Sequence, residues 1–204
     1  MVRRTKEEAM ATRESILDAA ETLFVAQGVS GTTLQHIASA AGVTRGAIYW
    51  HFEDKAAVFN ALMERARMPL ESAMRFLDKD DPADPLDDLR EYAQCVFRLT
   101  VDDPRARRVF EIASLKMEYV DELSGVRTRR RQNMEQWSAR AQSRVAIGVR
   151  RGQIRADVDA QAVALGLWAM IEGLIRNWLI TPAFDLAAVG ADVVGTYLNA
   201  LRVT

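Results

Sequence analysis

One short segment in the first third of the chain carries side chains suited to contact with DNA. The segment TRGAIYWHF runs from Thr44 to Phe52. A helix that enters the major groove presents small or polar side chains at its N-terminal end, flanked by groups that anchor phosphates. Gly46 and Ala47 allow close approach, and Arg45 can donate two hydrogen bonds to a guanine or hold a phosphate. The chemistry predicted here is recognition of duplex DNA.

Further hydrogen-bond donors lie beside these residues. Tyr49, Trp50 and His51 place a hydroxyl, an indole N–H and an imidazole N–H on the outer side of the predicted helix, where they suit phosphate oxygens. Lys55 adds a positive charge one turn later, and Thr33 can offer a backbone N–H at the start of the preceding helix. The alternative is an aromatic cluster inside a small core. Three such residues directly after a short pair of capped helices favour the DNA role.

Two short helices must position these side chains. Thr33 can cap a helix that Gly42 ends, and its apolar face comprises Leu34, Ile37, Ala38 and Ala41. Thr44 then caps a second helix, whose inward side is formed by Val43, Ala47, Ile48 and Phe52. Two short helices joined by a turn of three or four residues that contains glycine are typical of a helix-turn-helix. We therefore predict this motif over residues 33–52.

The remaining sequence predicts an all-α protein of about nine helices. Sustained period-2 alternation is missing, whereas apolar residues recur with the 3.6-residue period of helices from end to end. A first helix ends at Gly28, and a long helix runs from about 54 to 77 before an acidic, proline-containing break. The later helices are expected at about 86–101, 105–114, 122–151, 159–181 and 185–202. We divide the chain into a three-helix domain, residues 1–54, and a larger helical domain, residues 55–204.

The last two predicted helices favour association of two copies. The helix at 159–181 is apolar on nearly every side, so it needs cover from more than one direction. Together with the helix at 185–202 it can pair with the same helices of a second copy, as isologous dimers often do. The alternative is a membrane span over residues 162–180. Glu172 and Arg176 argue against a span, because ionised side chains are costly at the centre of a bilayer.

Composition restricts the function classes. The net charge is −1, and residues 1–67 hold eight basic and eight acidic residues, which argues against a sequence-indifferent DNA-architectural protein. The only histidines are His36 and His51, and metal-ligand spacings, phosphate-binding glycine loops and nucleophile motifs are missing, so we expect no enzyme, metal or cofactor. A single cysteine, Cys95, and the lack of a secretory signal predict a cytoplasmic protein.

The helix-turn-helix segment resembles the DNA-binding domain of the TetR family of bacterial repressors. The resemblance rests on GVSGTTLQHIASAAGVTRGAIYWHFEDKAAVFNAL, with its Gly-x-x-x-Thr-Thr opening, Ile-Ala-x-x-Ala-Gly-Val turn and Tyr-x-His-Phe-x-x-Lys close. The stretches MVRRTKEEA, RRVFEIASLKMEYVDEL and EGLIRNWL are similar to the AcrR/TtgR branch, which represses multidrug efflux-pump operons. The resemblance therefore covers nearly the whole chain.

This resemblance implies a dimeric repressor of an efflux-pump operon that binds double-stranded operator DNA and leaves it when a small hydrophobic effector binds. A repressor of a metabolic operon that senses a fatty-acyl compound or another metabolite is the alternative. The resemblance also implies a dimer through the last two helices. The positions that face DNA in the family match Thr33, Thr44, Arg45, Gly46, Tyr49, Trp50, His51 and Lys55.

The larger domain should then hold a mostly apolar ligand pocket. Soft methionines beside broad aromatics suit flat apolar ligands, and the candidates are Met74, Val96, Met117, Met134, Trp137, Trp168 and Ile171. Plain core filling is the alternative for each. Glu172 and Arg176 are four residues apart and form either a surface pair or polar groups that orient a ligand. Phe110 and Ser114 stand where the relatives place polar pocket groups. A basic cluster, Arg127 and Arg129–Arg131, is expected to be a solvated face rather than a second nucleic-acid patch.

Overall fold

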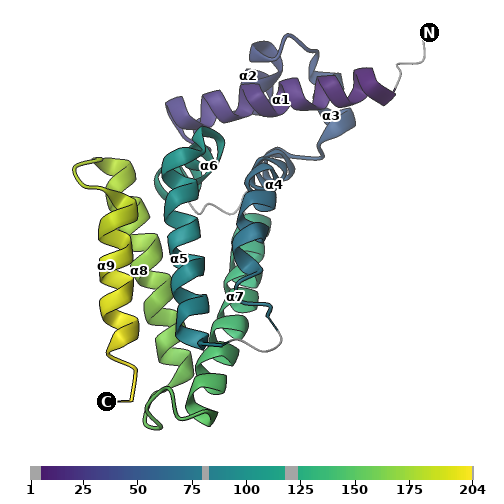
Figure 1. Cartoon of the computed structure of the whole chain (residues 1–204). Coiled ribbons are helices and arrows are strands. Elements are labelled where there is room, and N and C mark those ends of the chain that lie inside the picture. Colours follow the sequence, from purple (N-terminus) through teal and green to yellow (C-terminus); the bar gives the residue numbers. More distant parts are fainter. Residues whose placement is uncertain (1–5, 80–82, 118–123, 204) are drawn as a thin grey trace. The chain divides into compact units, whose positions relative to one another are not determined.

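The computed structural model describes residues 6–79, 83–117 and 124–203, and these residues form helices and connecting turns (Figure 1). The helices are α1 (Lys6–Gln27), α2 (Leu34–Ala40), α3 (Arg45–His51), α4 (Lys55–Met74), α5 (Pro85–Asp102), α6 (Pro104–Leu115), α7 (Ser124–Arg150), α8 (Ala160–Ile180) and α9 (Leu186–Asn199). The one β pairing within the described residues is an isolated bridge between Ile154 and Arg202. The predicted all-α class is confirmed.

Local chemistry sets the helix ends. Gly28 and Gly42 adopt φ values of +79° and +66°, the left-handed conformation that ends a helix and that other residues rarely adopt. Asp84, Asp159 and Asp185 cap α5, α8 and α9, each accepting a hydrogen bond from a backbone N–H of the first turn. The carboxylates at these starts thus satisfy N–H groups that have no partner within the helix.

The chain forms two compact units that do not coincide with the division at residue 54. The N-terminal unit comprises Met1–Ala66 and Arg108–Arg129, and the C-terminal unit comprises Arg67–Arg107 and Arg130–Thr204. Three helices, α4, α6 and α7, therefore contribute residues to both units. Arg108, Lys116 and Arg129 join the first unit through contacts with residues far apart in the sequence, which helix periodicity does not reveal.

The N-terminal unit has a continuous apolar core. Phe24 of α1 and Phe59 of α4 lie with ring centroids 6.3 Å apart, and both side chains are buried. Ile37 of α2 and Ile48 of α3 are completely buried in the same cluster, and Ile112 of α6 also belongs to it. Each short helix of the predicted motif is thus held by at least one fully buried isoleucine.

The C-terminal unit packs α5 against both α8 and α9 (Figure 1). Gly190 allows α9 to approach α5 closely, because a Cβ at this position would lie 2.5 Å from the Phe97 ring of α5. Deeper in the unit, the Trp137 ring of α7 lies 5.7 Å from the Tyr92 ring and 5.1 Å from the Trp168 ring. These three aromatic residues, from α5, α7 and α8, are called the aromatic cluster below.

Candidate DNA interface

The second short helix presents a polar, exposed surface, as its sequence predicts. The Thr44 hydroxyl accepts a hydrogen bond from the Ala47 N–H at 3.2 Å, which fixes the start of α3. On the inner side Ile48 is fully buried. Tyr49 and Trp50 are 48% and 73% exposed, so they do not form the small aromatic core that was the alternative. Their polar atoms are therefore accessible to a ligand as large as DNA.

Arg45 and Tyr49 form a pair on the surface of α3. The guanidinium Nη2 donates a hydrogen bond to the Tyr49 hydroxyl at 3.3 Å, and its carbon lies 5.5 Å from the centre of the ring. This hydrogen bond raises the pKa of the Arg45 guanidinium above its ordinary value, so the group stays charged. Tyr49 therefore orients Arg45 before any DNA is bound.

Lys55, predicted as a phosphate anchor, has a hydrogen bond within the N-terminal unit. Its side chain is buried, and the Nζ atom donates a hydrogen bond to the Thr32 carbonyl at 3.0 Å. A buried carbonyl needs such a partner, because losing it costs about 1–3 kcal/mol. We therefore propose that Lys55 holds the turn that precedes α2 in place of a direct phosphate contact. Its position at the start of α4, where the chain folds back toward Thr32, was not visible in the sequence.

Thr33 begins α2 through a capping box whose second member is a histidine. The His36 N–H donates to the Thr33 hydroxyl at 3.1 Å, and the Thr33 N–H donates to His36 Nδ1 at 3.4 Å. Gln27 adds a hydrogen bond to the Thr32 hydroxyl at 3.2 Å. Sequence reasoning missed Gln27 and His36 as positioning residues. The Thr-x-x-His spacing is a signal that could have found the second, with His replacing the usual Glu or Gln.

The predicted ligand residues are divided between the two units. Phe110, Ser114 and Met117 lie in the N-terminal unit, where Met117 packs against the core. The structure therefore does not gather all eleven residues in one unit. The remaining candidates in the C-terminal unit are Met74, Val96, Met134, Trp137, Trp168, Ile171, Glu172 and Arg176.

Glu172, one of the two polar candidates on α8, has a partner on another helix. Glu172 Oε1 accepts a hydrogen bond from Arg130 Nη2 of α7 at 2.6 Å, whereas Arg176 is exposed. A partner 42 residues away in sequence cannot be inferred from helical spacing. Glu172 thus joins α8 to α7.

Comparison with known proteins agrees with this geometry. Residues 16–62 match the family model for bacterial regulatory proteins of the tetR family, and residues 84–203 match the C-terminal region of MAATS-type transcriptional repressors. The HTH-type transcriptional regulator TtgR of Pseudomonas putida is 40% identical over 205 residues, covering 100% of this chain and 98% of the relative. The chain belongs to the TetR family. It is accordingly a DNA-binding transcriptional regulator and not an enzyme.

Solved structures of two repressors of multidrug efflux pumps share the fold. NalD, the secondary repressor of the MexAB-OprM multidrug efflux pump in Pseudomonas aeruginosa, has a TM-score of 0.88 at 31% identity, covering 97% of this chain and 98% of that chain. SmeT, solved as a complex with triclosan, has a TM-score of 0.81 at 31% identity, covering 95% and 92% of the two chains. The similarity of fold thus extends over nearly the whole of this chain.

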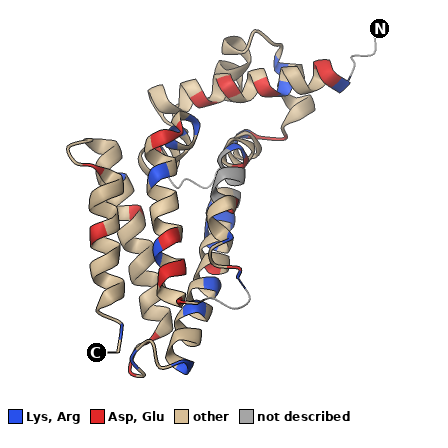
Figure 2. Cartoon of the chain, viewed as in Figure 1, with Lys and Arg blue, Asp and Glu red and all other residues tan. Residues whose placement is uncertain are grey.

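The basic cluster of this TetR-family chain is largely ion-paired. Arg129 pairs with Glu64, Arg130 with Glu172, and Arg131 with Glu135 at 3.8 Å. Lys and Arg are also interspersed with Asp and Glu along the helices (Figure 2). These pairings argue against a second nucleic-acid patch and leave α3 as the candidate surface for DNA.

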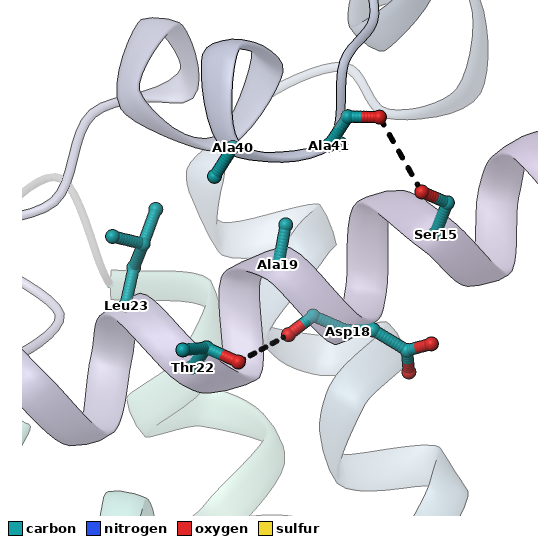
Figure 3. A pocket seen from close by; sticks show the side chains of 7 residues that line it. All are labelled: Ser15, Asp18, Ala19, Thr22, Leu23, Ala40 and Ala41. Carbon is teal, nitrogen blue, oxygen red and sulfur yellow. Dashed lines mark hydrogen bonds between the residues drawn. The ribbon is translucent and has the colours of Figure 1, made fainter.

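A groove on the N-terminal unit lies between α1 and the end of α2 (Figure 3). The Ser15 hydroxyl donates a hydrogen bond to the Ala41 carbonyl at 3.5 Å. The Asp18 carboxylate forms an ion pair with Arg65 Nη1 at 2.7 Å. The lining residues are Ser15, Asp18, Ala19, Thr22, Leu23, Ala40 and Ala41, and none of them is among the predicted ligand residues. The groove is therefore distinct from the expected effector site.

Replacing Lys55 by methionine, which keeps the apolar stem, tests its proposed role. Because the Thr32 carbonyl loses its partner, we expect the free energy of unfolding to fall by about 1–3 kcal/mol. Operator affinity should also fall, whereas the slope of log affinity against log salt should not change, since no phosphate contact is lost. Urea unfolding and DNA titrations at several salt concentrations measure both quantities. A slope reduced by about one unit at unchanged stability would restore the phosphate contact.

Proposed function

We propose that this TetR-family chain represses a multidrug efflux-pump operon and leaves its operator when a hydrophobic or aromatic compound binds the C-terminal unit. The observation that carries this proposal is the 40% identity to TtgR over the whole chain. Repressors of efflux pumps are also among its structural neighbours at 31% identity. The fatty-acyl alternative has support only from structures 18 to 19% identical, which argue for the fold alone. We assign the protein to the cytoplasm, where its DNA target lies.

The DNA contacts of this proposal come from α3 and the start of α2. Arg45 reads a base or holds a phosphate, Gly46 and Ala47 permit close approach, and Thr44 lies at the helix start nearest the groove. Phosphate contacts come from Tyr49, Trp50, His51 and the N-terminal end of α2 at Thr33. Exposure of Tyr49 and Trp50 supports these roles.

A homodimer through α8 and α9 is the second part of the proposal. Leu165 and Ile180 of α8 are each 60% exposed, and Val189 and Val193 of α9 are 36% and 37% exposed. α8 is long and apolar enough to span a membrane, and 28% of its apolar window is buried within one chain. A second copy would cover these apolar side chains. The two α3 helices of the dimer, one from each copy, would then reach successive major grooves.

Replacing Val193 by glutamate tests this interface. A carboxylate at an apolar contact between copies must lose its hydration, so we expect the dimer to dissociate. Sedimentation should give a mass near 22.8 kDa for the variant and about twice that mass for the unchanged protein. Operator affinity should fall with the dimer. A similar glutamate at the exposed position Ala139 of α7 serves as the control, and a dimer that survives the Val193 change would refute this interface.

Effector binding must also be transmitted to α3, and α6 offers a route besides the long helix α4. Arg108 of α6 binds Glu21 of α1, and Glu21 is only 7% exposed. The Val29 N–H, just after α1, donates to the Lys116 carbonyl at 2.9 Å. Arg65 of α4 binds Asp18 of the same acidic side of α1, whose Asp and Glu residues are red in Figure 2. Displacement of α6 would therefore move α1 within the N-terminal unit.

Replacing Arg108 by alanine tests this route. Arg65 Nη1 remains 3.7 Å from the buried Glu21 carboxylate, so the variant should fold. The effector should weaken operator binding of this variant less than that of the unchanged protein. Allosteric coupling typically changes the affinity for a ligand about 5- to 150-fold. In the variant, we expect the logarithm of the factor by which the effector weakens operator binding to fall by at least half. Arg105→Ala, an exposed position on the same helix, is the control. An unaltered factor would exclude the Arg108 route.

The proposed function is tested by a gel shift with the promoter fragment beside the gene. The purified protein should retard this fragment in the presence of excess bulk DNA, and triclosan, the compound bound to SmeT, should release it. A fragment of equal length without the promoter is the control. Failure to retard the promoter at modest salt would refute the repressor role, and retention despite triclosan would favour a metabolite as the signal.

A further inference from the structure

The Trp137 indole N–H is a buried donor without a hydrogen-bond partner. The Trp137 side chain is only 2% exposed, and its Nε1 atom finds no acceptor among the described residues. Unlike the other buried unpaired nitrogens, those of Arg65 and Arg144, it is the sole polar atom of its side chain. All of the hydrogen-bonding capacity of this residue is therefore unused, which is costly in a folded protein.

The surroundings of this N–H suit an aromatic ligand. Trp137 lies between the Tyr92 ring and the Trp168 ring, with interplanar angles of 43° and 56°. Rings tilted at such distances pack favourably against one another, and an aromatic ligand can make the same kind of contact. Burial of the Tyr92 side chain, with the nearby Cys95 and Glu172, raises the pKa of its hydroxyl, so the phenol is uncharged. The aromatic cluster therefore offers broad apolar faces and no free charge of its own.

Two charged side chains on the helices that carry Trp137 and Trp168, those of Arg130 and Glu172, neutralise each other. Glu172 follows Trp168 by one turn of α8, and Arg130 precedes Trp137 by two turns of α7. Their side chains form a hydrogen-bonded ion pair at 2.6 Å. A ligand with a net charge would have to compete with one member of this pair. A neutral ligand leaves the pair intact.

We propose that the effector is a flat, neutral aromatic compound whose acceptor oxygen takes the Trp137 N–H hydrogen bond against the aromatic cluster. This inference rests on the proposed function, since it names the chemistry of the effector of the same regulator. Trp137 is then the residue that distinguishes oxygen-bearing aromatics from pure hydrocarbons. A site that pairs a buried donor in this way discriminates more strongly than an apolar pocket alone.

The test compares two ligands that differ by one oxygen. 9-Fluorenone carries a carbonyl on a flat three-ring frame, and fluorene has a methylene in its place. In equilibrium dialysis with the full chain, 9-fluorenone should bind about 5- to 10-fold more tightly than fluorene. Trp137→Phe keeps an aromatic ring but removes the N–H, so it should reduce this ratio to below about twofold. Trp168→Phe, the matched control, alters the cluster but keeps the Trp137 donor, so the ratio should persist.

A second measurement observes the hydrogen bond itself. The chain has four tryptophans, so a ¹H–¹⁵N correlation spectrum should contain four indole signals, and the signal missing in Trp137→Phe belongs to Trp137. That proton should shift downfield with 9-fluorenone and much less with fluorene. No binding of 9-fluorenone, an unmoved Trp137 signal, or a ratio that survives Trp137→Phe would each overturn the inference. Promoter retardation and release by triclosan are scored separately, so the repressor role can stand when this inference fails.

Discussion

Replacing Arg144 by alanine is expected to lower the free energy of unfolding by about 3–5 kcal/mol. Arg144 of α7 is 3% exposed, and its Nε and Nη2 atoms donate to the Leu77 carbonyl at 3.1 and 2.5 Å. Nη2 also donates to the Lys79 carbonyl at 2.6 Å, and Nε lies 3.6 Å from the buried Asp88 carboxylate. The alanine variant would leave these carbonyls without their buried donor. Among the described residues, Asp88 would keep Lys79 as a cation.

The same helix provides a matched control. Arg140 lies one helical turn before Arg144 and binds Asp78, the residue after Leu77, at 2.6 Å. Both side chains of this pair are more than a third exposed. Arg140→Ala should therefore cost less than about 1 kcal/mol. Urea unfolding followed by circular dichroism, at equal protein concentration because the regulator is dimeric, measures both values. Equal losses for the two variants would mean that burial of Arg144 contributes nothing.

Replacing Arg45 by alanine should weaken operator binding about 10- to 100-fold and relax the preference at one operator position. The reason is that a guanidinium at the N-terminal end of α3 can bind a guanine through two hydrogen bonds, which alanine cannot replace. Binding titrations against operators that vary at each position measure both effects. A loss of affinity that is equal for all sequences would assign Arg45 to a phosphate instead.

Tyr49 separates two ways in which the pair can act. Tyr49→Phe removes the hydroxyl that accepts the Arg45 hydrogen bond at 3.3 Å. If Tyr49 acts by orienting Arg45, the double variant should bind no worse than Arg45→Ala alone. If its hydroxyl also contacts a phosphate, as we propose, the two losses should add and the salt slope should fall. The thermal stability of both variants should match that of the unchanged protein, because both side chains are exposed.

Local sequence was sufficient for the helix-turn-helix. Thr33 and Thr44 cap the two short helices, Gly42 separates them, and Ile37 and Ile48 are buried as their spacing requires. Each of these features depends on neighbours within about four residues, and capping and amphipathic periodicity act over that range. The exposed run that includes Tyr49 follows from the same periodicity. Resemblance to the TetR family rested on the same residues.

Several features were decided only when distant segments met. Lys55 approaches Thr32, and Glu172 approaches Arg130. Arg108 and Lys116 contact Glu21 and Val29, respectively. The unpaired Trp137 N–H likewise depends on α5 and α8 reaching α7. Long charged and aromatic side chains have many possible partners at helical spacing, and burial in the assembled core selects among them. The sequence by itself thus determined the DNA-reading motif, whereas tertiary packing decided which charges are paired and which polar atom is left for a ligand.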